Sequence, residues 1–333
     1  MNVNELFDRL HLPFESRMPG FAGATGWVNS KPLTADDIQG KVVLADFGTF
    51  TCINWIRTLP YVRAWNERYR DHGLLTVGVQ TPEFGIEHDT GRIERSLRAM
   101  DIDYPVAIDN DYTIWNAFAN QYWPALYLAD ADGHIRHHHF GEGGYDRTER
   151  AIQHLLTDAG ATGLPAGLAA VEPRGIEVAA DWHSVRSPET YVGLARSEGF
   201  ASPDRGVFDE PSGYTAPARL HLNEWALTGN WTIRREDAVC NQPNGGIRYR
   251  FHARDLNLIL APPAEGTAVP FRVRLDGEAP GTTHGLDVDD DGNGVVEYTR
   301  LYQLIRQPSD IKDRLFEIDF PEPGIGALCF TFG

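Results

Sequence analysis

The sequence predicts two domains of different class, an α/β domain followed by an all-β sandwich of the jelly-roll type. In the first half, short apolar runs alternate with amphipathic segments of helical period, which is typical of a mainly parallel sheet covered by helices. Residues 158–187 are rich in alanine, glycine and proline and lose this alternation. After Ser187, short alternating segments are separated by Gly, Pro, Asn and Asp, as in two-sheet sandwiches.

These changes of pattern set the expected boundaries. We expect an N-terminal arm over residues 1–33, with a short helix near Asn4–Leu10, and an α/β domain over 34–158. A linker over 159–187 should lead into the β-sandwich domain, 188–333.

The first domain should be a sheet of five main strands. Strands are expected at Val42–Phe47, Leu74–Gln80, Pro105–Ile108, Ala125–Asp130 and Ile135–Phe140. Helices are expected from Cys52 to Tyr69, over Gly91–Met100, around Ile114–Phe118 and over Tyr145–Leu156. Pro60 should kink the first of these helices. The short turn at residues 131–133 implies an antiparallel pair at one edge of the sheet.

The second domain should contain about eight strands. They are expected at Ala218–Leu222, Trp225–Arg234, Gly246–His252, Leu256–Leu260, Phe271–Asp276, Val295–Ile305, Leu315–Phe320 and Ala327–Phe332.

Composition excludes several classes of partner. The formal net charge is −17, from 47 acidic and 30 basic residues, which argues against binding to nucleic acid or to an anionic membrane. No apolar run reaches the roughly 18 residues that span a bilayer, and the first residues lack the pattern of a signal peptide, so we expect a cytoplasmic protein. Three distant cysteines provide neither a disulfide framework nor zinc-type spacing. We expect no metal and no cofactor.

Cys52 is the candidate nucleophile, because it lies where a buried strand turns into a helix. Backbone N–H groups at a helix start and the positive end of the helix dipole favour a thiolate. The alternative is that Cys52 is a small buried apolar residue, as free cysteines often are.

Three features resemble the thioredoxin superfamily, within it the redoxin branch that includes the disulfide reductases of cytochrome maturation. They are Cys52 at the helix start, Pro60 eight residues later, and Trp123-Pro124 before a late strand. The resemblance implies a cis peptide bond at Pro124, with this proline against the active-site sulfur.

A narrower resemblance covers residues 27–333. The segments TCIN, LPYVRAW, TPEF, DNDYTIWNAFANQYWP and HHHFGEG, and the tail from RLYQLIRQP to FTFG, occur in order. They are similar to the soluble C-terminal region of DipZ-type membrane thiol transporters. That region joins a thioredoxin-like domain to a jelly roll like that of carbohydrate-binding modules.

The chain departs from dithiol relatives at Trp55, which occupies the position of the second cysteine in Cys-x-x-Cys. The motif Cys-Ile-Asn-Trp cannot perform a self-contained dithiol exchange. A monothiol redox protein remains, acting by thiol–disulfide exchange or by peroxide reduction. Its partners would be a low-molecular-weight thiol or a protein disulfide. The alternative is a binding or scaffolding protein with a degenerate redoxin domain, whose jelly roll binds a sugar or a protein.

Several residues could assist the thiol. Thr49 and Thr51 could stabilise the thiolate, and Thr49 also matches the Thr-x-x-Cys element of peroxiredoxins, although the peroxiredoxin arginine is missing near Pro124. Cytochrome-maturation relatives carry a glutamate near Glu83, which could relay protons or be a solvated loop residue. Trp55, Trp123 and Pro124 could form the substrate groove, or the two tryptophans could be core residues.

Three other patterns have an ordinary structural explanation as well as a functional one. His137, His138 and His139 alternate along a strand, which favours packed or solvated histidines over a metal site. The acidic run 287–292 resembles a calcium loop, but Tyr298 replaces the bidentate glutamate that such a loop needs. Aromatic residues of the second domain could stack on sugars or fill the core between its sheets; they are Trp225, Trp231, Tyr249, Tyr298 and Tyr302.

Overall fold

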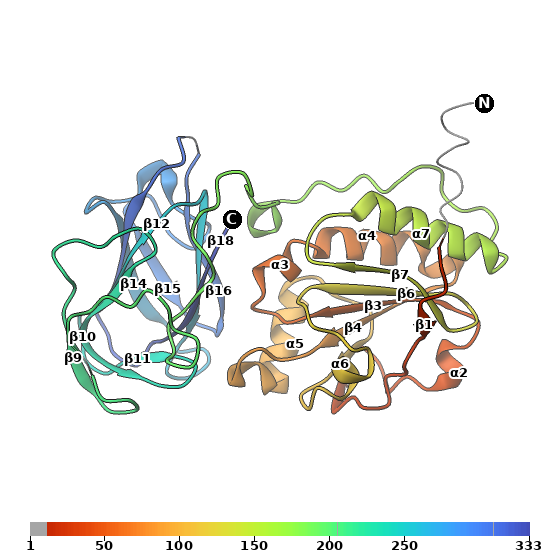
Figure 1. The fold of residues 1–333 in the computed structure, drawn as a ribbon, viewed down its shortest axis with the longest axis horizontal. Helices are drawn as coiled ribbons and strands as arrows, with labels where there is room; N and C mark the ends of the chain where they lie inside the picture. Colours follow the sequence, from red (N-terminus) through yellow and green to blue (C-terminus); the bar gives the residue numbers. More distant parts are fainter. Residues whose placement is uncertain (1–11, 205, 309) are drawn as a thin grey trace. The chain divides into compact units, whose positions relative to one another are not determined.

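The structure is a computed structural model that describes residues 12–204, 206–308 and 310–333 (Figure 1). The expected helix near Asn4–Leu10 lies outside the described residues. The chain divides into two compact units, with the boundary between Glu177 and Val178. We call them the amino-terminal and the carboxyl-terminal unit. Their boundary falls inside the stretch that the sequence analysis expects to be a linker.

The amino-terminal unit is built on a mixed sheet whose strands have the order β1-β7-β6-β3-β4-β5-β2. Its strands are β1 (Ser16–Arg17), β2 (Gly26–Val28), β3 (Val42–Gly48), β4 (Leu74–Gln80), β5 (Val106–Ile108), β6 (Ala125–Ala129) and β7 (His134–Phe140). The pairs β3/β4 and β4/β5 are parallel, whereas β3/β6 and β6/β7 are antiparallel. The central parallel strands and the antiparallel pair at the edge confirm the predicted α/β class.

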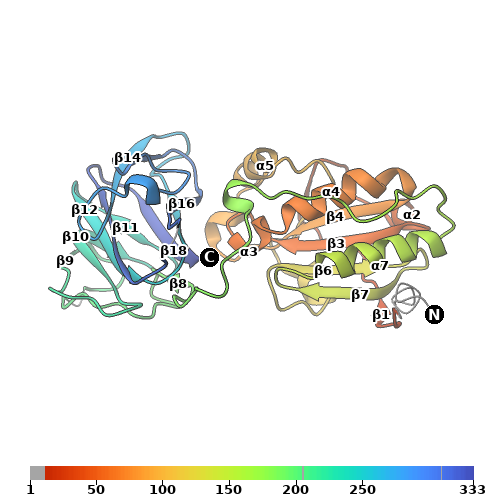
Figure 2. The ribbon, with the colours of Figure 1, turned by 90° about the horizontal axis from the view of Figure 1, so that it is seen from above.

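Helices cover both faces of this sheet. The α-helices are α2 (Ala35–Ile38), α3 (Ile53–Ile56), α4 (Leu59–Tyr69), α5 (Thr90–Ala99), α6 (Thr113–Ala117) and α7 (Tyr145–Asp158). Figure 1 shows α4 and α7 on one face and α6 on the other, and Figure 2 shows α4 and α7 side by side over the strands. Under α6, the side chains of Phe47, Trp115 and Phe118 form part of one apolar core.

The segment after Cys52 forms two helices, so the prediction of one helix kinked at Pro60 is wrong. The helix α3 ends at Ile56, and α4 begins at Leu59. Pro60 lies in the first turn of α4, where a missing backbone N–H breaks no helical hydrogen bond. The spacing of apolar residues does not distinguish one kinked helix from two separate helices, because it continues unchanged across the break.

In the part of the carboxyl-terminal unit that the structure describes, strands and loops are interrupted by one short 3-10 turn and by no α-helix. Its strands are β8 (Thr190–Tyr191), β9 (Ser212–Tyr214), β10 (Trp225–Ile233), β11 (Ala238–Cys240), β12 (Gly245–Phe251), β13 (Asp255–Ala261), β14 (Val269–Leu275), β15 (Asn293–Val296), β16 (Arg300–Arg306), β17 (Arg314–Phe320) and β18 (Gly326–Phe332). All neighbouring strands are antiparallel, in the order β15-β14-β17-β12-β10-β11-β18-β13-β16. This arrangement confirms the predicted all-β sandwich.

The strand β10 belongs to both sheets of this sandwich. Residues 225–228 pair with β12, and residues 231–233 pair with β11. Gly229 lies between the two segments with a φ of +87°, a conformation that favours glycine, and lets the strand bend from one sheet into the other.

Two strand predictions for this unit are wrong. Residues 218–222 form no strand, and no described strand pairs with them. The expected strand Val295–Ile305 is divided, because the chain leaves β15 in one sheet and enters β16 in the other.

The core between the sheets is aromatic. Trp225, Trp231, Tyr249 and Tyr302 are at most 1% exposed and belong to one apolar cluster, so these four residues present no stacking surface to a sugar.

Among the described residues, no helix is long and apolar enough to cross a membrane.

Candidate functional site

Four segments meet at the edge of the amino-terminal sheet where the central strands β3 and β4 end. Gly48, at the end of β3, pairs with Gln80 at the end of β4, and Phe47 pairs with Ala125 at the start of β6. The Thr81 N–H donates to the Gly48 carbonyl at 3.1 Å, and the Gly141 N–H donates to the Pro124 carbonyl at 2.9 Å. This pairing brings together the segments that follow β3, β4 and β7 and the segment that precedes β6.

Cys52 lies at this edge as the N-cap residue of α3 and is partly exposed. Its N–H donates to the Thr49 carbonyl at 3.0 Å, and its carbonyl accepts the Ile56 N–H at 3.0 Å. These two bonds fix the turn that presents the thiol. None of the three cysteines, all of them described, forms a disulfide, and Cys240 and Cys329 are buried in the carboxyl-terminal unit.

A buried polar cluster lies directly behind the Cys52 turn. The Thr51 hydroxyl donates to the Glu87 carboxylate, and the Thr49 hydroxyl accepts a hydrogen bond of 2.7 Å from the Gln80 amide. Glu87 also accepts the backbone N–H of Phe84 at 3.0 Å. Burial raises the pKa of Glu87 to about 7, against the opposing effect of these donors. The carboxyl group therefore changes its charge near neutral pH, and it is bonded to Thr51, the residue before Cys52.

Glu83, the glutamate that the sequence analysis selects, donates its backbone N–H to this cluster. Its side chain is partly exposed, and its backbone N–H donates to the Glu87 carboxylate. Sequence reasoning selects the loop of Glu83 but misses Glu87, which lies 36 residues from Thr51. No spacing rule in the sequence could have paired them.

Trp55 points into the unit and does not line a surface groove. It is 3% exposed, and its indole N–H lies 3.1 and 3.2 Å from the two carboxylate oxygens of Asp46. A Cβ atom on Gly48 would lie only 2.2 Å from the Trp55 ring, so the glycine on β3 makes room for the indole. Burial raises the pKa of Asp46 to about 7, and the Tyr104 hydroxyl also donates to it.

The Trp123–Pro124 peptide bond is cis, and Pro124 is buried. The Trp123 indole N–H donates to the Thr81 carbonyl at 3.1 Å, and its ring packs on Trp115 with a centroid distance of 4.2 Å. These contacts hold Trp123 at the edge that also carries Cys52, where it is partly exposed. Tyr122, the residue before it, is 51% exposed.

A buried ion pair connects the helical segment after Cys52 to the loop after β7. The Arg57 guanidinium lies 3.2 Å from the Glu142 carboxylate, and the two side chains are 1% and 8% exposed. Glu142 lies next to Gly141, which bonds to Pro124. The ion pair therefore joins the Cys52 segment to the loop that supports the cis proline, and sequence reasoning assigned no role to either residue.

The three consecutive histidines have three different partners. His137 bonds to the Thr148 hydroxyl, His138 to the Glu15 carboxylate and His139 to the Glu142 carbonyl. Within the described ranges, the one group with metal-like spacing is Asp130, Asp132 and His134, and Asp130 is already paired with Arg136 at 2.9 Å. These contacts support the interpretation of the histidines as packed or solvated residues.

The chain is similar to known proteins along almost its whole length. Residues 187–333 match the family described as thioredoxin like C-terminal domain. Protein DipZ of Mycobacterium bovis and of Mycobacterium tuberculosis is 35% identical over 324 residues, which cover 95% of this chain and 42% of each relative. Over this length the chain resembles the DipZ proteins. It spans less than half the length of the DipZ proteins that it matches.

The chain is also similar to shorter proteins. Thiol-disulfide oxidoreductase YkuV of Bacillus subtilis is 29% identical over 141 residues, which cover 42% of this chain and 95% of the relative. A solution structure of a thioredoxin-like protein in the oxidised form is 29% identical, with a TM-score of 0.40, and covers 43% of this chain and 96% of that one.

Proposed function

We propose that the chain is a monothiol redox protein in which Cys52 exchanges disulfides with external thiols. The observation that carries the proposal is the environment of Cys52, a partly exposed thiol at the sheet edge that also holds the cis Pro124. The position three residues later holds the buried Trp55 in place of a second thiol. The name of one relative, the thiol-disulfide oxidoreductase YkuV, supports this reaction class.

The proposed reaction has two steps. The Cys52 thiolate attacks one sulfur of a disulfide, forms a mixed disulfide with it and releases the other half as a thiolate. A second external thiolate then attacks the sulfur of the bound half, forms a new external disulfide and releases Cys52 as thiolate. No electrons are gained or lost overall, because one disulfide is consumed and another is formed.

The residues around Cys52 would assist by positioning it. The Thr49 carbonyl fixes the turn, and Thr51 connects that turn to Glu87. A Glu87 carboxylate that loses its proton near pH 7 places a negative charge close to the thiolate and disfavours it. We therefore assign Glu87 as a positioning residue that controls the ionisation of the thiol.

Intact-mass spectrometry of the reduced protein tests the proposal. After brief exposure to oxidised glutathione, we expect one glutathione adduct on Cys52 that external thiol removes, and no adduct on the Cys52→Ser variant. A parallel sample receives stoichiometric peroxide and a sulfenic acid trap. If the trap labels Cys52 and no glutathione adduct forms, the reaction would be reduction of peroxide through a sulfenic acid on Cys52 and not thiol–disulfide exchange. No adduct in either sample would favour the binding or scaffolding function.

The Glu87→Gln variant should change how the rate of Cys52 alkylation depends on pH. In the unmodified chain, ionisation of Glu87 near pH 7 should produce an inflection in the logarithm of the rate, because the new negative charge disfavours the thiolate. Glutamine keeps an acceptor for Thr51 but carries no charge, so the inflection should disappear. Glu83→Gln is the matched control in the same loop and should keep it. An inflection that persists in Glu87→Gln would exclude the assigned role.

A further inference from the structure

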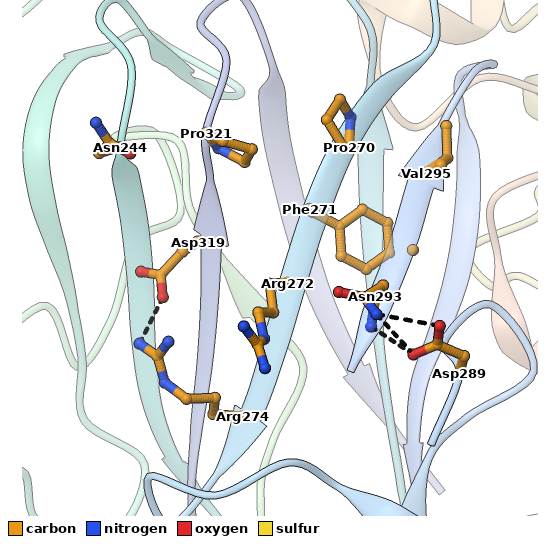
Figure 3. A pocket seen from close by; sticks show the side chains of 11 residues that line it. Asn244, Pro270, Phe271, Arg272, Arg274, Asp289, Asn293, Val295, Asp319 and Pro321 are labelled. Carbon is orange, nitrogen blue, oxygen red and sulfur yellow. Dashed lines mark hydrogen bonds and ion pairs between the residues drawn. The ribbon is translucent and has the colours of Figure 1, made fainter. Parts of the chain in front are cut away.

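A pocket of about 570 Å³, lined by both charged and apolar side chains, opens on the outer face of the carboxyl-terminal unit (Figure 3). Its floor is formed by β14 and β17, and its sides by β15, the turn before it and the turn before β12. We call it the Arg272 pocket, after the side chain that stands in its middle in Figure 3. Its volume lies in the range of about 300 to 1,000 Å³ that is typical of sites for small molecules.

Most charged groups in and around this pocket neutralise one another. The Asp319 carboxylate contacts Arg274 at 2.5 Å and Arg248 at 2.7 Å. Glu317 contacts Arg248 at 2.8 Å. Asp289 accepts the backbone N–H of Asn293 at 2.8 Å as well as the amide of its side chain.

Arg272 also lies in this pocket, but none of these ion pairs neutralises its charge. The strand register places it opposite Asp319 on β17 and opposite Asn293 on β15. The Asp319 carboxylate, however, forms its ion pairs with Arg274 and Arg248. The Arg272 side chain is exposed, and within the described ranges it takes part in no hydrogen bond, ion pair or ring contact. The Asn244 carboxamide at the rim of the pocket likewise bonds to no described residue.

We propose that the Arg272 pocket binds a small organic carboxylate that has an apolar body. A guanidinium presents paired donors whose geometry matches a carboxylate. Pro270, Val295 and Pro321 provide apolar contact beside it. A singly charged carboxylate fits better than a phosphate dianion, because Asp289, whose hydrogen-bond partner Asn293 is uncharged, lies in the same pocket and repels additional negative charge. This site is independent of the proposed thiol chemistry.

The test compares two compounds that differ in one group. N-acetyl-L-leucine carries the carboxylate, and N-acetyl-L-leucinamide has the same body without the charge. Each is titrated into the isotope-labelled full chain at low ionic strength, and binding is followed by NMR chemical shifts. We expect saturable binding of the acid, localised to β14, β15 and β17, and binding of the amide that is weaker by roughly tenfold or more.

Two variants make the result specific. Arg272→Gln should weaken binding of the acid to the level of the amide. Arg235→Gln removes another exposed arginine of the same unit, at the turn after β10, and should bind like the unmodified chain. Equal binding of acid and amide, unchanged binding by Arg272→Gln, or binding of inorganic phosphate as tight as that of the acid would each overturn the proposal.

Discussion

Replacing Glu142 by glutamine is expected to destabilise the amino-terminal unit by about 3 to 5 kcal/mol. The Arg57 guanidinium is 1% exposed, and Glu142 is the carboxylate that neutralises it. The Nε atom of Arg57 already lacks a hydrogen-bond partner among the described residues. Removal of the carboxylate charge leaves a buried cation without compensation, which costs more than the hydrogen bond itself. Urea unfolding followed by hydrogen exchange and mass spectrometry measures the change and assigns it to residues 12–177.

The double variant Arg57→Met with Glu142→Leu is the control for this ion pair. It removes both charges together and fills the same space with apolar side chains, so it should retain most of the stability. It should also unfold at a higher urea concentration than Glu142→Gln alone. A single variant that is as stable as the unmodified chain would show that water reaches Arg57 and that the pair contributes little.

Raising the pH from 4 to 8 is expected to lower the free energy of unfolding of the amino-terminal unit. Burial raises the pKa of Asp46 and of Glu87 to about 7, from ordinary values of 3.8 and 4.5. Between these values the folded chain retains both protons and the unfolded chain loses them, so stability decreases as the pH rises and becomes constant above about 7. Each group should contribute on the order of 3 kcal/mol to the decrease.

Two single variants separate these contributions. Asp46→Asn and Glu87→Gln should each reduce the decrease of stability with rising pH, and the double variant should abolish that decrease. Glu94→Gln, which removes an exposed carboxylate on α5, is the control for loss of one negative charge. Burial lowers the pKa of His137 to about 4, so this histidine opposes the decrease below about pH 6.5, but the two carboxyl groups together outweigh it. Stability that increases between pH 5 and 7 would therefore contradict the prediction.

The position of Cys52 could be predicted from the sequence because local patterns define it. Val42–Phe47 is a continuous apolar strand, and the period changes to that of a helix directly after the cysteine. The effect of Pro60 is not defined by these patterns: the sequence predicts a kink, whereas the proline lies in the first turn of α4. A proline in the first turn of a new helix and a proline that kinks a longer one leave the same apolar period around them.

The polar partners of the site could not be predicted in this way. Arg57 and Glu142 are 85 residues apart, and Thr51 and Glu87 are 36 residues apart. They meet because the segments after β3, β4 and β7 converge at one edge of the sheet. Helical or strand periodicity carries no information about contacts of this range. The sequence indicated the loop of Glu83, but which of its two glutamates turns inward depends on packing.

Trp55 has a consequence for attempts to convert this chain into a dithiol enzyme. A cysteine at position 55 would supply the missing sulfur, but it would also empty the space under Gly48 and remove the donor that the indole offers to Asp46. A single substitution at this position therefore cannot create a Cys-x-x-Cys motif without a cost in folding. A designer would have to refill that space from β3 at the same time, with Gly48 as the first position to vary.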